Sequence, residues 1–506
     1  MQKYVIIILF HFLMSQGVNT YLSYNEKIYI EIEAIKKNNE FNELFIFPGI
    51  QKKPKNKLNL IKKYSKLLKL EPIFALRYSN IGFEIDEENT PSKAIWITPG
   101  IHLSSQIPFY YNFTSSWFYI WTDFYKHAAY GFNGEIILRN KKLFNYNPYH
   151  SIEYYEQSTN MFKGIEFDEG QGGIAFISPS FNIILAKMKS NLGPFFRDNL
   201  SISKSAPSFQ QIRLVKKFAG KKNIFFTYIF GSLNSNLVDS TLLNNYTDII
   251  ENYRLPKISK YVVLHRLDVS FSNSFRLGMY EKLIFGARPI PIEYLNPLIP
   301  FWSAQHSLGD LDNLLIGIDF SYLKGKNRFI GSFFMDEWNP YVTFNKNKNR
   351  NWFGYQLGLS RLESINRKDL LFKLEYTKLD PRVYNHRFEI NEPSHHNYNL
   401  GFWTGGHTED VWFSVIYLIN EKSLINFNYE ITRIGQQNIY NQYNNIKIDF
   451  LNGIVKKRTV YSIMYTYKLA FFDYKISFKL YDTLNLGYKQ NKFNELSFSL
   501  MYNISY

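Results

Sequence analysis

The chain has no cysteine among its 506 residues, which excludes disulfide bonds, thiolate metal sites and a cysteine nucleophile. Beyond the N-terminus it also lacks any run approaching the ~18 apolar residues of a membrane-spanning helix. Acidic residues are relatively few, with 43 Asp and Glu against 59 Lys and Arg. The resulting net charge of +16 suits anionic lipid, acidic polysaccharide or nucleic acid. No nucleic-acid-binding motif is present, so nucleic acid is not expected as a partner.

Aromatic residues, by contrast, are abundant. The chain contains 45 Phe, 39 Tyr and 8 Trp, together 18% of its residues, yet its mean hydropathy is only −0.27. Many aromatic residues combined with modest hydropathy are typical of strands that present one face to lipid and headgroups and the other face to water.

The N-terminal residues have the pattern of a secretory signal. A charged start is followed by the apolar core "YVIIILFHFLMS", and Ser15 and Gly17 are small residues suited to cleavage. We therefore predict a signal peptide at residues 1–17, with a lone membrane anchor as the alternative. Residues 18–90 contain helical spacing at 59–70 and few alternations, which predicts a small helical or mixed cap.

From residue 91 to the end, apolar and polar residues alternate. In "LINFNYEITR" and "FDYKISFKL" every second residue is apolar, and such segments of ~9–12 residues are long enough to cross a bilayer as tilted strands. Charged residues such as Lys373 and Glu375 share the polar parity, as expected for a wet or plugged lumen. A soluble β-sandwich also alternates, but it would not need so many long, aromatic-flanked strands.

These patterns predict an all-β fold. Residues 91–506 are expected to form a transmembrane outer-membrane β-barrel of ~16–20 antiparallel strands, at roughly 20–24 residues per strand and connection. The protein would be integral to the cell outer membrane, with outer-membrane lipid as a partner. The final segment, "ELSFSLMYNISY", is expected to pair with the first strand, and its aromatic last residue resembles the signal read by the barrel insertion machinery, a further expected partner.

The least strand-like part of the barrel region is the proline-rich segment 286–313. It contains Tyr294, Trp302, Asp310 and Asp312. Aromatic faces stack on the CH groups of sugar rings, and carboxylates accept hydrogen bonds from sugar hydroxyls, so the segment is a candidate ligand site. The alternative is a long loop that folds inward and constricts the barrel.

Signals for catalysis or metal binding are weak. Asp336 and Glu337 are adjacent on an expected strand and would point to opposite faces, which prevents a paired acid and base role. His386, His395 and His396 lack carboxylates at ligand spacing, and no G-x-S-x-G motif of a hydrolase occurs. We therefore predict no catalytic residue, no metal site and no cofactor.

Two segments carry a family resemblance. "NLGPFFRDNLSISKSAPSFQQIRL" (191–214) has a Gly-Pro, Arg, Asn and Ala-Pro-x-Phe series. "LHRLDVSFSNSFRLGMYEKLIFGARPIPIEYLNPLIPFWSAQHSLGDLDNLLIGIDF" (264–320) has His-Arg, Gly-x-x-Glu, Tyr-Leu-Asn-Pro and Gly-Asp-x-Asp-Asn. In order and spacing both resemble the Wzi-like capsule-assembly outer-membrane proteins. The resemblance implies a barrel that binds or attaches capsular or surface polysaccharide in a lectin-like manner, without catalysis.

The expected function is thus polysaccharide attachment, with a porin-like diffusion channel as the alternative and a barrel hydrolase as a weaker one. The Gly-Asp-x-Asp-Asn series could instead cap a turn, and Arg266 with Glu281 could form an ion pair in the lumen. The candidate polysaccharide-binding residues are Arg197, Asn199, Arg266, Tyr294, Asn296, Trp302, Asp310, Asp312 and Asn313.

Overall fold

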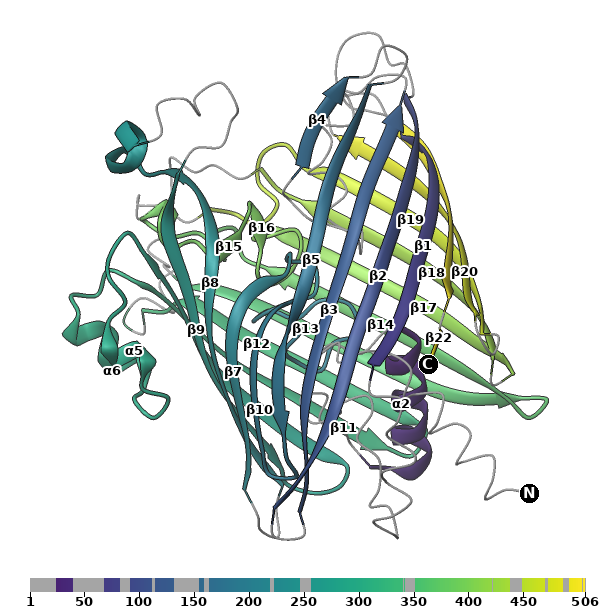
Figure 1. Cartoon of the computed structure of the whole chain (residues 1–506), viewed down its shortest axis with the longest axis horizontal. Coiled ribbons are helices and arrows are strands. Elements are labelled where there is room, and N and C mark those ends of the chain that lie inside the picture. The colour runs from purple at the N-terminus through teal and green to yellow at the C-terminus, as the bar shows by residue number, and fades with distance from the viewer. Residues whose placement is uncertain are drawn as a thin grey trace.

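The computed structural model is almost entirely β-structure arranged as a barrel (Figure 1). The residues it describes are 24–39, 68–81, 92–111, 114–131, 154–158, 163–218, 223–245, 256–339, 341, 351–420, 422–436, 448–468, 472–485, 491–502 and 504–505. The predicted signal peptide and most of the segment 59–70 lie outside these residues.

Within the described ranges, twenty strands form one antiparallel sheet. They are β1 (Leu68–Ile81), β2 (Ser92–Tyr111), β3 (Thr114–Gly131), β4 (Tyr154–Ser158), β5 (Lys163–Ile177), β6 (Phe181–Met188), β7 (Phe209–Phe218), β8 (Ile224–Val238), β9 (Lys257–Ser270), β10 (Phe275–Gly286), β11 (Asn313–Lys324), β12 (Asn327–Glu337), β13 (Trp352–Ile365), β14 (Lys368–Leu379), β17 (Thr408–Asn420), β18 (Ser423–Ile434), β19 (Lys456–Lys468), β20 (Phe472–Asn485), β21 (Asn491–Tyr502) and β22 (Ile504–Ser505). A separate two-stranded sheet joins β15 (Ser394–His395) to β16 (Tyr398–Asn399).

Among the residues that the structure describes, the helical elements are few and short. They are α2 (Tyr24–Lys37), α5 (Ile292–Leu295) and α6 (Phe301–Ser307), with 3-10 turns η3 (Ser240–Asn245) and η6 (Glu389–Asn391). Among the described residues, no helix has the length and apolar character needed to cross a membrane.

The first and last strands close the barrel. β1 pairs with β2 on one side and with β21 and β22 on the other, so that Leu76 lies opposite Phe498. Of the twenty strands, β4 pairs only with β5 and β22 continues β21, which leaves eighteen strands around the described wall. The predicted all-β barrel, its strand number and its closure by the C-terminal strand are confirmed.

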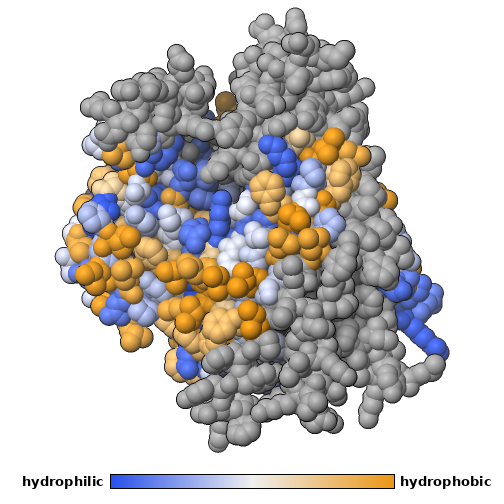
Figure 2. Space-filling view, in the orientation of Figure 1, coloured by the Kyte–Doolittle hydropathy of each residue, from blue (hydrophilic) through white to orange (hydrophobic). Residues whose placement is uncertain are grey.

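Side chains alternate between the two faces of the wall. Along β17, residues with buried and partly exposed side chains alternate at every position from Thr408 to Ile419. The outward parity is apolar, and Figure 2 shows hydrophobic residues gathered across the strands on the visible face. Such a surface is stable in lipid and unstable in water. Exposed apolar residues of the wall include Phe74, Ile107, Phe124, Ile174, Leu185, Ile212, Met279, Ile318, Phe329, Leu357, Leu374, Phe427, Ile463 and Phe478.

The two ends of the barrel differ in their connections. At one end the strands join through short turns, for example at β11–β12 and β13–β14; at the other end they join through long loops, including 189–208, 287–312 and 380–407. Outer-membrane barrels place short turns in the periplasm and long loops outside the cell. The long-loop end is therefore the outer end.

Helix α2 lies within the ring of strands at the short-turn end (Figure 1). Its Ile28, Ile32 and Ile35 are buried against inward-facing residues such as Leu371 and Ile416. The predicted N-terminal helical part is thus present. The barrel, however, begins at Leu68 rather than at residue 91, because β1 already pairs with β2 and β21.

The lumen is packed with protein at the long-loop end. The 189–208 connection, here called the inner loop, enters the barrel and packs against the 380–407 loop. The Ser203 N–H donates to the Leu400 carbonyl at 2.6 Å and joins the two loops, and the Leu192 N–H donates to the Ile202 carbonyl at 2.9 Å within the inner loop. Their buried apolar residues include Leu192, Leu200, Ile202, Val383, Tyr384, Leu400, Phe402 and Trp403.

Candidate functional site

The 287–312 connection between β10 and β11, here called the flap, lies outside the barrel wall beside β8 and β9 (Figure 1). Its Tyr294 and Phe301 are fully buried against outward-facing residues of the wall, among them Val263, Leu283 and Phe285. The inward, constricting course considered from the sequence is therefore wrong. Outward residues at the end of β10 are as apolar as inward ones, and the flap packs on them.

Asp312 organises the base of the flap. Its carboxylate accepts hydrogen bonds from the Tyr294 hydroxyl, at 2.5 Å, and from the guanidinium of Arg288. Burial raises the pKa of Asp312, and burial together with Asp312 raises the pKa of Tyr294, so the phenol stays protonated and donates. Tyr228 on β8 then donates to the Tyr294 carbonyl at 2.9 Å. In this geometry Asp312 and Tyr294 hold the flap on the wall.

Glu281 and His265 lie directly opposite each other on the outer face of β10 and β9. The Glu281 carboxylate accepts the backbone N–H of Phe301, at the start of α6, at 2.7 Å. The Phe301 ring stacks on His265 with ring centroids 3.8 Å apart. The flap thus covers two polar residues that the strand pattern directs outward, and the suggested ion pair between Arg266 and Glu281 is wrong because the two side chains lie on opposite faces.

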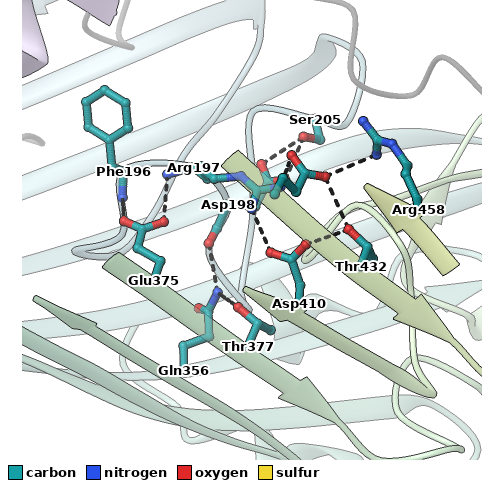
Figure 3. A network of polar contacts seen from close by, with 11 residues as sticks. Phe196, Arg197, Asp198, Ser205, Gln356, Glu375, Thr377, Asp410, Thr432 and Arg458 are labelled. Carbon is teal, nitrogen blue, oxygen red and sulfur yellow. Dashed lines mark hydrogen bonds and ion pairs between the residues drawn. The ribbon is translucent and has the colours of Figure 1, made fainter. Parts of the chain in front are cut away.

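Arg197, at the tip of the inner loop, lies in the lumen at the centre of a polar network (Figure 3). Its guanidinium contacts Asp410 on β17 at 2.6 Å and Glu430 on β18 at 3.1 Å. Its backbone N–H and that of Phe196 both donate to the carboxylate of Glu375 on β14, at 3.3 and 2.8 Å. The network ties the inner loop to three strands of the wall.

Asn199 stabilises the turn of the same loop. Its Oδ1 accepts the backbone N–H of Phe195 at 3.0 Å, and its Nδ2 donates to Asn191 Oδ1 at 2.8 Å. A Cβ on Gly193, whose φ is +141°, would overlap with the Asn199 side chain. The Gly and Asn of the first sequence segment therefore act together in forming this turn.

Arg266, on the inner face of β9, is fastened to the wall by two carboxylates. It donates to Asp268 at 2.7 and 2.9 Å and to Asp319 on β11 at 2.6 and 2.8 Å. To reach Asp319 the guanidinium crosses Gly278 of β10, which lies between the two acidic residues in register. This double fork engages four of the five N–H groups of the arginine, and the residue is buried.

We expect Gly278→Ala to destabilise the barrel. A Cβ at this position would overlap with Arg266 and lie 2.7 Å from the Asp319 carboxylate, so the buried pair would have to shift, at a cost of about 1–3 kcal/mol. Thermal unfolding followed by gel mobility of unboiled samples measures the effect. Gly170→Ala is the control, because a Cβ there meets nothing within 4 Å; equal unfolding temperatures for both variants would contradict the expectation.

The remaining candidates lie in or near the flap. Asn313 donates through its amide to the Asn391 carbonyl at 3.0 Å, and Asn296 accepts the Leu298 N–H at 3.0 Å. The carbonyl of Asp310, which has φ of +57°, accepts from Arg387. The Gly-Asp-x-Asp-Asn series therefore shapes the turn that ends the flap, as the sequence alternative suggested.

Exposure divides the nine candidates into two groups. Asn296, Trp302 and Asp310 are exposed and all belong to the flap. The other six have buried side chains with hydrogen-bond partners within the chain, namely Arg197, Asn199, Arg266, Tyr294, Asp312 and Asn313.

A small exposed group at the outer end was not singled out from the sequence. Arg387 and Phe388 of the 380–407 loop are exposed, with the guanidinium carbon 5.0 Å from the ring centroid. The half-buried His386 ring is 5.7 Å from the Phe388 ring, and the contact of Arg387 with Asp310 adds the base of the flap. We call Asp310, His386, Arg387 and Phe388 the outer rim. Its only sequence signal is the loss of alternation after β14.

Of the histidines considered for metal binding, His395 makes structural contacts. His395 accepts the Asn234 N–H at its Nδ1 (2.8 Å), and its Nε2 lies 3.2 Å from the Ser208 carbonyl. These contacts fasten the 380–407 loop to β8 and to the inner loop. Within the described ranges, no group of three or more His, Asp or Glu side chains is placed to hold a metal ion.

The closed antiparallel wall, apolar outer surface and polar or packed lumen define an integral outer-membrane β-barrel. Among solved structures, the chain is similar to Wzi of Escherichia coli, an outer membrane protein involved in group 1 capsule assembly and described as a carbohydrate-binding β-barrel. The identity is 12%, the match covers 90% of each chain, and the TM-score is 0.52.

Two other solved barrels are also similar. OccAB4 of Acinetobacter baumannii is 9% identical over 86% of this chain and 98% of that chain, with a TM-score of 0.46. The outer membrane protein OprD of Pseudomonas aeruginosa is 11% identical over 87% and 94%, with a TM-score of 0.42. No family model matches the chain, and no curated protein matches it.

Proposed function

We propose that this barrel binds surface polysaccharide, such as a capsular polymer, at its outer end. The observation that carries the proposal is the filled lumen. Phe195, Leu200 and Ile202 of the inner loop, with Leu400 and Phe402 of the 380–407 loop, are at most 1% exposed inside the barrel. This core occupies part of the described lumen, and it favours a role at the surface over a diffusion channel.

Three further features support a polysaccharide as the ligand. The net charge of +16 favours an acidic polymer. The two segments that resemble the Wzi-like family form the inner loop and the flap. The fold is also shared with Wzi, the carbohydrate-binding barrel of E. coli. The buried candidates such as Arg197 and Asp312 would serve by holding the loops in place.

The outer rim has the chemistry of a sugar-binding surface. The exposed Phe388 ring offers a face for the CH groups of a sugar. Arg387 can pair with a sugar carboxylate, and Asp310 can accept hydrogen bonds from hydroxyls. Burial lowers the pKa of His386 to about 4, so its imidazole is neutral at physiological pH. Its Nδ1 accepts the Phe388 N–H at 3.1 Å, which leaves the Nε2–H as a donor for a ligand.

We expect the double variant Arg387→Ala/Phe388→Ala to bind the cells' own surface polysaccharide about tenfold more weakly, equivalent to roughly 1.4 kcal/mol. The reason is the loss of a stacking ring and a cation from one exposed patch. The measurement is cell-bound polysaccharide per molecule of barrel, with a binding isotherm on the purified protein.

The matched control is Arg361→Ala/Phe271→Ala. These residues are also an exposed arginine and an exposed phenylalanine, but they lie at the short-turn end, in β13 near its turn and in the β9–β10 turn. Both double variants should keep heat-modifiable gel mobility. Equal polysaccharide binding by the rim variant and the control would remove the outer rim as the site.

A further inference from the structure

The flap has a strongly apolar outer surface. Its exposed large apolar residues, with their exposed fractions, are Ile290 (37%), Ile292 (79%), Leu295 (46%), Leu298 (83%), Trp302 (59%) and Leu311 (46%). A surface patch of this kind on a folded protein marks contact with another apolar phase or molecule. The inner side of the flap is already covered by the wall, so the patch faces away from the barrel.

The charged residues of the flap lie mostly at its base. Between Pro289 and Gly309, Glu293 is the only Asp, Glu, Lys or Arg. Arg288, Asp310 and Asp312 gather at the base, where Arg288 and Asp312 form an ion pair. An element with a polar base, an apolar tip and an exposed tryptophan matches segments that lie at the boundary between headgroups and acyl chains.

The position of the flap places this surface next to lipid. The flap packs on the outward residues Leu283 and Phe285, which share a face of β10 with Met279. Met279 is 42% exposed and Ile318 beside it on β11 is 38% exposed, so both belong to the apolar surface of the wall. The apolar surface of the flap is therefore continuous with the lipid-facing surface of the barrel.

The polar contacts under the flap agree with this placement. Glu281 faces outward on the same strand, where an uncovered carboxylate would meet lipid at a large cost. It is covered by α6, whose first N–H groups carry partial positive charge, and it accepts the Phe301 N–H at 2.7 Å. A charged residue that faces outward has to be covered where acyl chains surround the wall, and the flap covers Glu281 in this way.

We propose that the flap is a lipid-binding element of the outer leaflet, with Ile292, Leu298 and Trp302 inserted among the acyl chains beside β8 to β10. The ligand class is a membrane amphiphile with its headgroup near the base of the flap. The flap then holds the outer rim at a fixed height above the membrane, because Asp310 joins the flap to Arg387.

Because the chain has no cysteine, a single introduced cysteine can be labelled at one chosen position. Single variants Leu298→Cys, Met279→Cys and Asp310→Cys are labelled with a nitroxide in phospholipid vesicles, and the accessibility of each label to oxygen and to a water-soluble nickel chelate is measured. Oxygen concentrates in the acyl region and the chelate in water. All three residues are exposed, so the labels should not perturb the packing, which heat-modifiable mobility checks.

The expected result is a high ratio of oxygen to nickel accessibility at Leu298→Cys, as at Met279→Cys, and a low ratio at Asp310→Cys. A label at 298 that is as accessible to nickel as the label at 310 would overturn the proposal, because the flap would then lie in water. A label protected from both reagents would also overturn it, since a second copy of the chain would then cover the flap.

Discussion

Arg197→Ala is expected to open the lumen. Removal of the guanidinium leaves the buried carboxylates of Asp410 and Glu430 without their partner on the inner loop, and the loss of one partner from a buried pair costs about 3–5 kcal/mol. The inner loop should then leave the wall for part of the time. We expect a lower unfolding temperature, and a higher ion conductance in a planar bilayer than that of the unaltered protein.

The control for this prediction uses the same two strands. Arg433 on β18 pairs with Glu409 on β17, but the arginine is 46% exposed, and an exposed pair contributes about 0–1 kcal/mol. Arg433→Ala should therefore unfold near the temperature of the unaltered protein and remain closed. If Arg197→Ala also remained closed, the packed loops rather than the ionic network would be holding the lumen shut.

Glu31→Gln is expected to release α2 from the lumen. The Glu31 carboxylate binds Lys373 on β14, lies 3.5 Å from Arg328 on β12, and accepts from Ser360 on β13 at 2.6 Å. A neutral amide would leave two buried cations without a counter-charge, again at a cost of about 3–5 kcal/mol. Limited proteolysis of the folded barrel, with cleavage in α2 as the readout, measures the release.

The same carboxylate predicts a dependence on pH. Burial alone would raise the pKa of Glu31, but Lys373 and Arg328 together lower it from 4.5 to about 2. The stabilisation is therefore complete above pH 4.5 and is lost as the pH falls towards 2, by about 3 kcal/mol in total. Protease cleavage of α2 should increase over this range in the unaltered protein and be nearly constant in Glu31→Gln.

Glu33→Gln is the matched control within the same helix. Glu33 is 54% exposed and pairs with Lys37 four residues later, so its replacement should change stability by less than about 1 kcal/mol. Equal release of α2 by the two variants would show that the apolar contacts of Ile28, Ile32 and Ile35 position the helix without Glu31.

The family resemblance located structurally important segments but did not assign their roles. Its first segment forms the inner loop and its second runs from β9 to β11 through the flap. Arg197 forms hydrogen bonds with Glu375 and Asp410, which are 178 and 213 residues away in the chain. A single sequence does not reveal such pairings, because charged residues on the lumen parity are numerous and their partners depend on strand order and register.

The alternation of apolar and polar residues determined the class of this protein. A period of two fixes which side chains share a face, so the wall, its lipid-facing surface and its closure by "ELSFSLMYNISY" followed from the sequence. The flap shows where the pattern stops being informative. Residues 287–312 do not alternate, and both faces of β10 near Gly286 are apolar, with Ile284 inward and Phe285 outward.

Only the tertiary structure decided that the flap lies outside the barrel while two other loops fill the lumen. The inner loop occupies the lumen because three strands present carboxylates to Arg197 and its neighbour. The flap lies outside because Glu281 and His265 point outward and are covered by Phe301. The local alternation of residues determines which face of the sheet each strand residue occupies. The course of a loop depends instead on the distant groups with which it can form hydrogen bonds, ion pairs and apolar contacts.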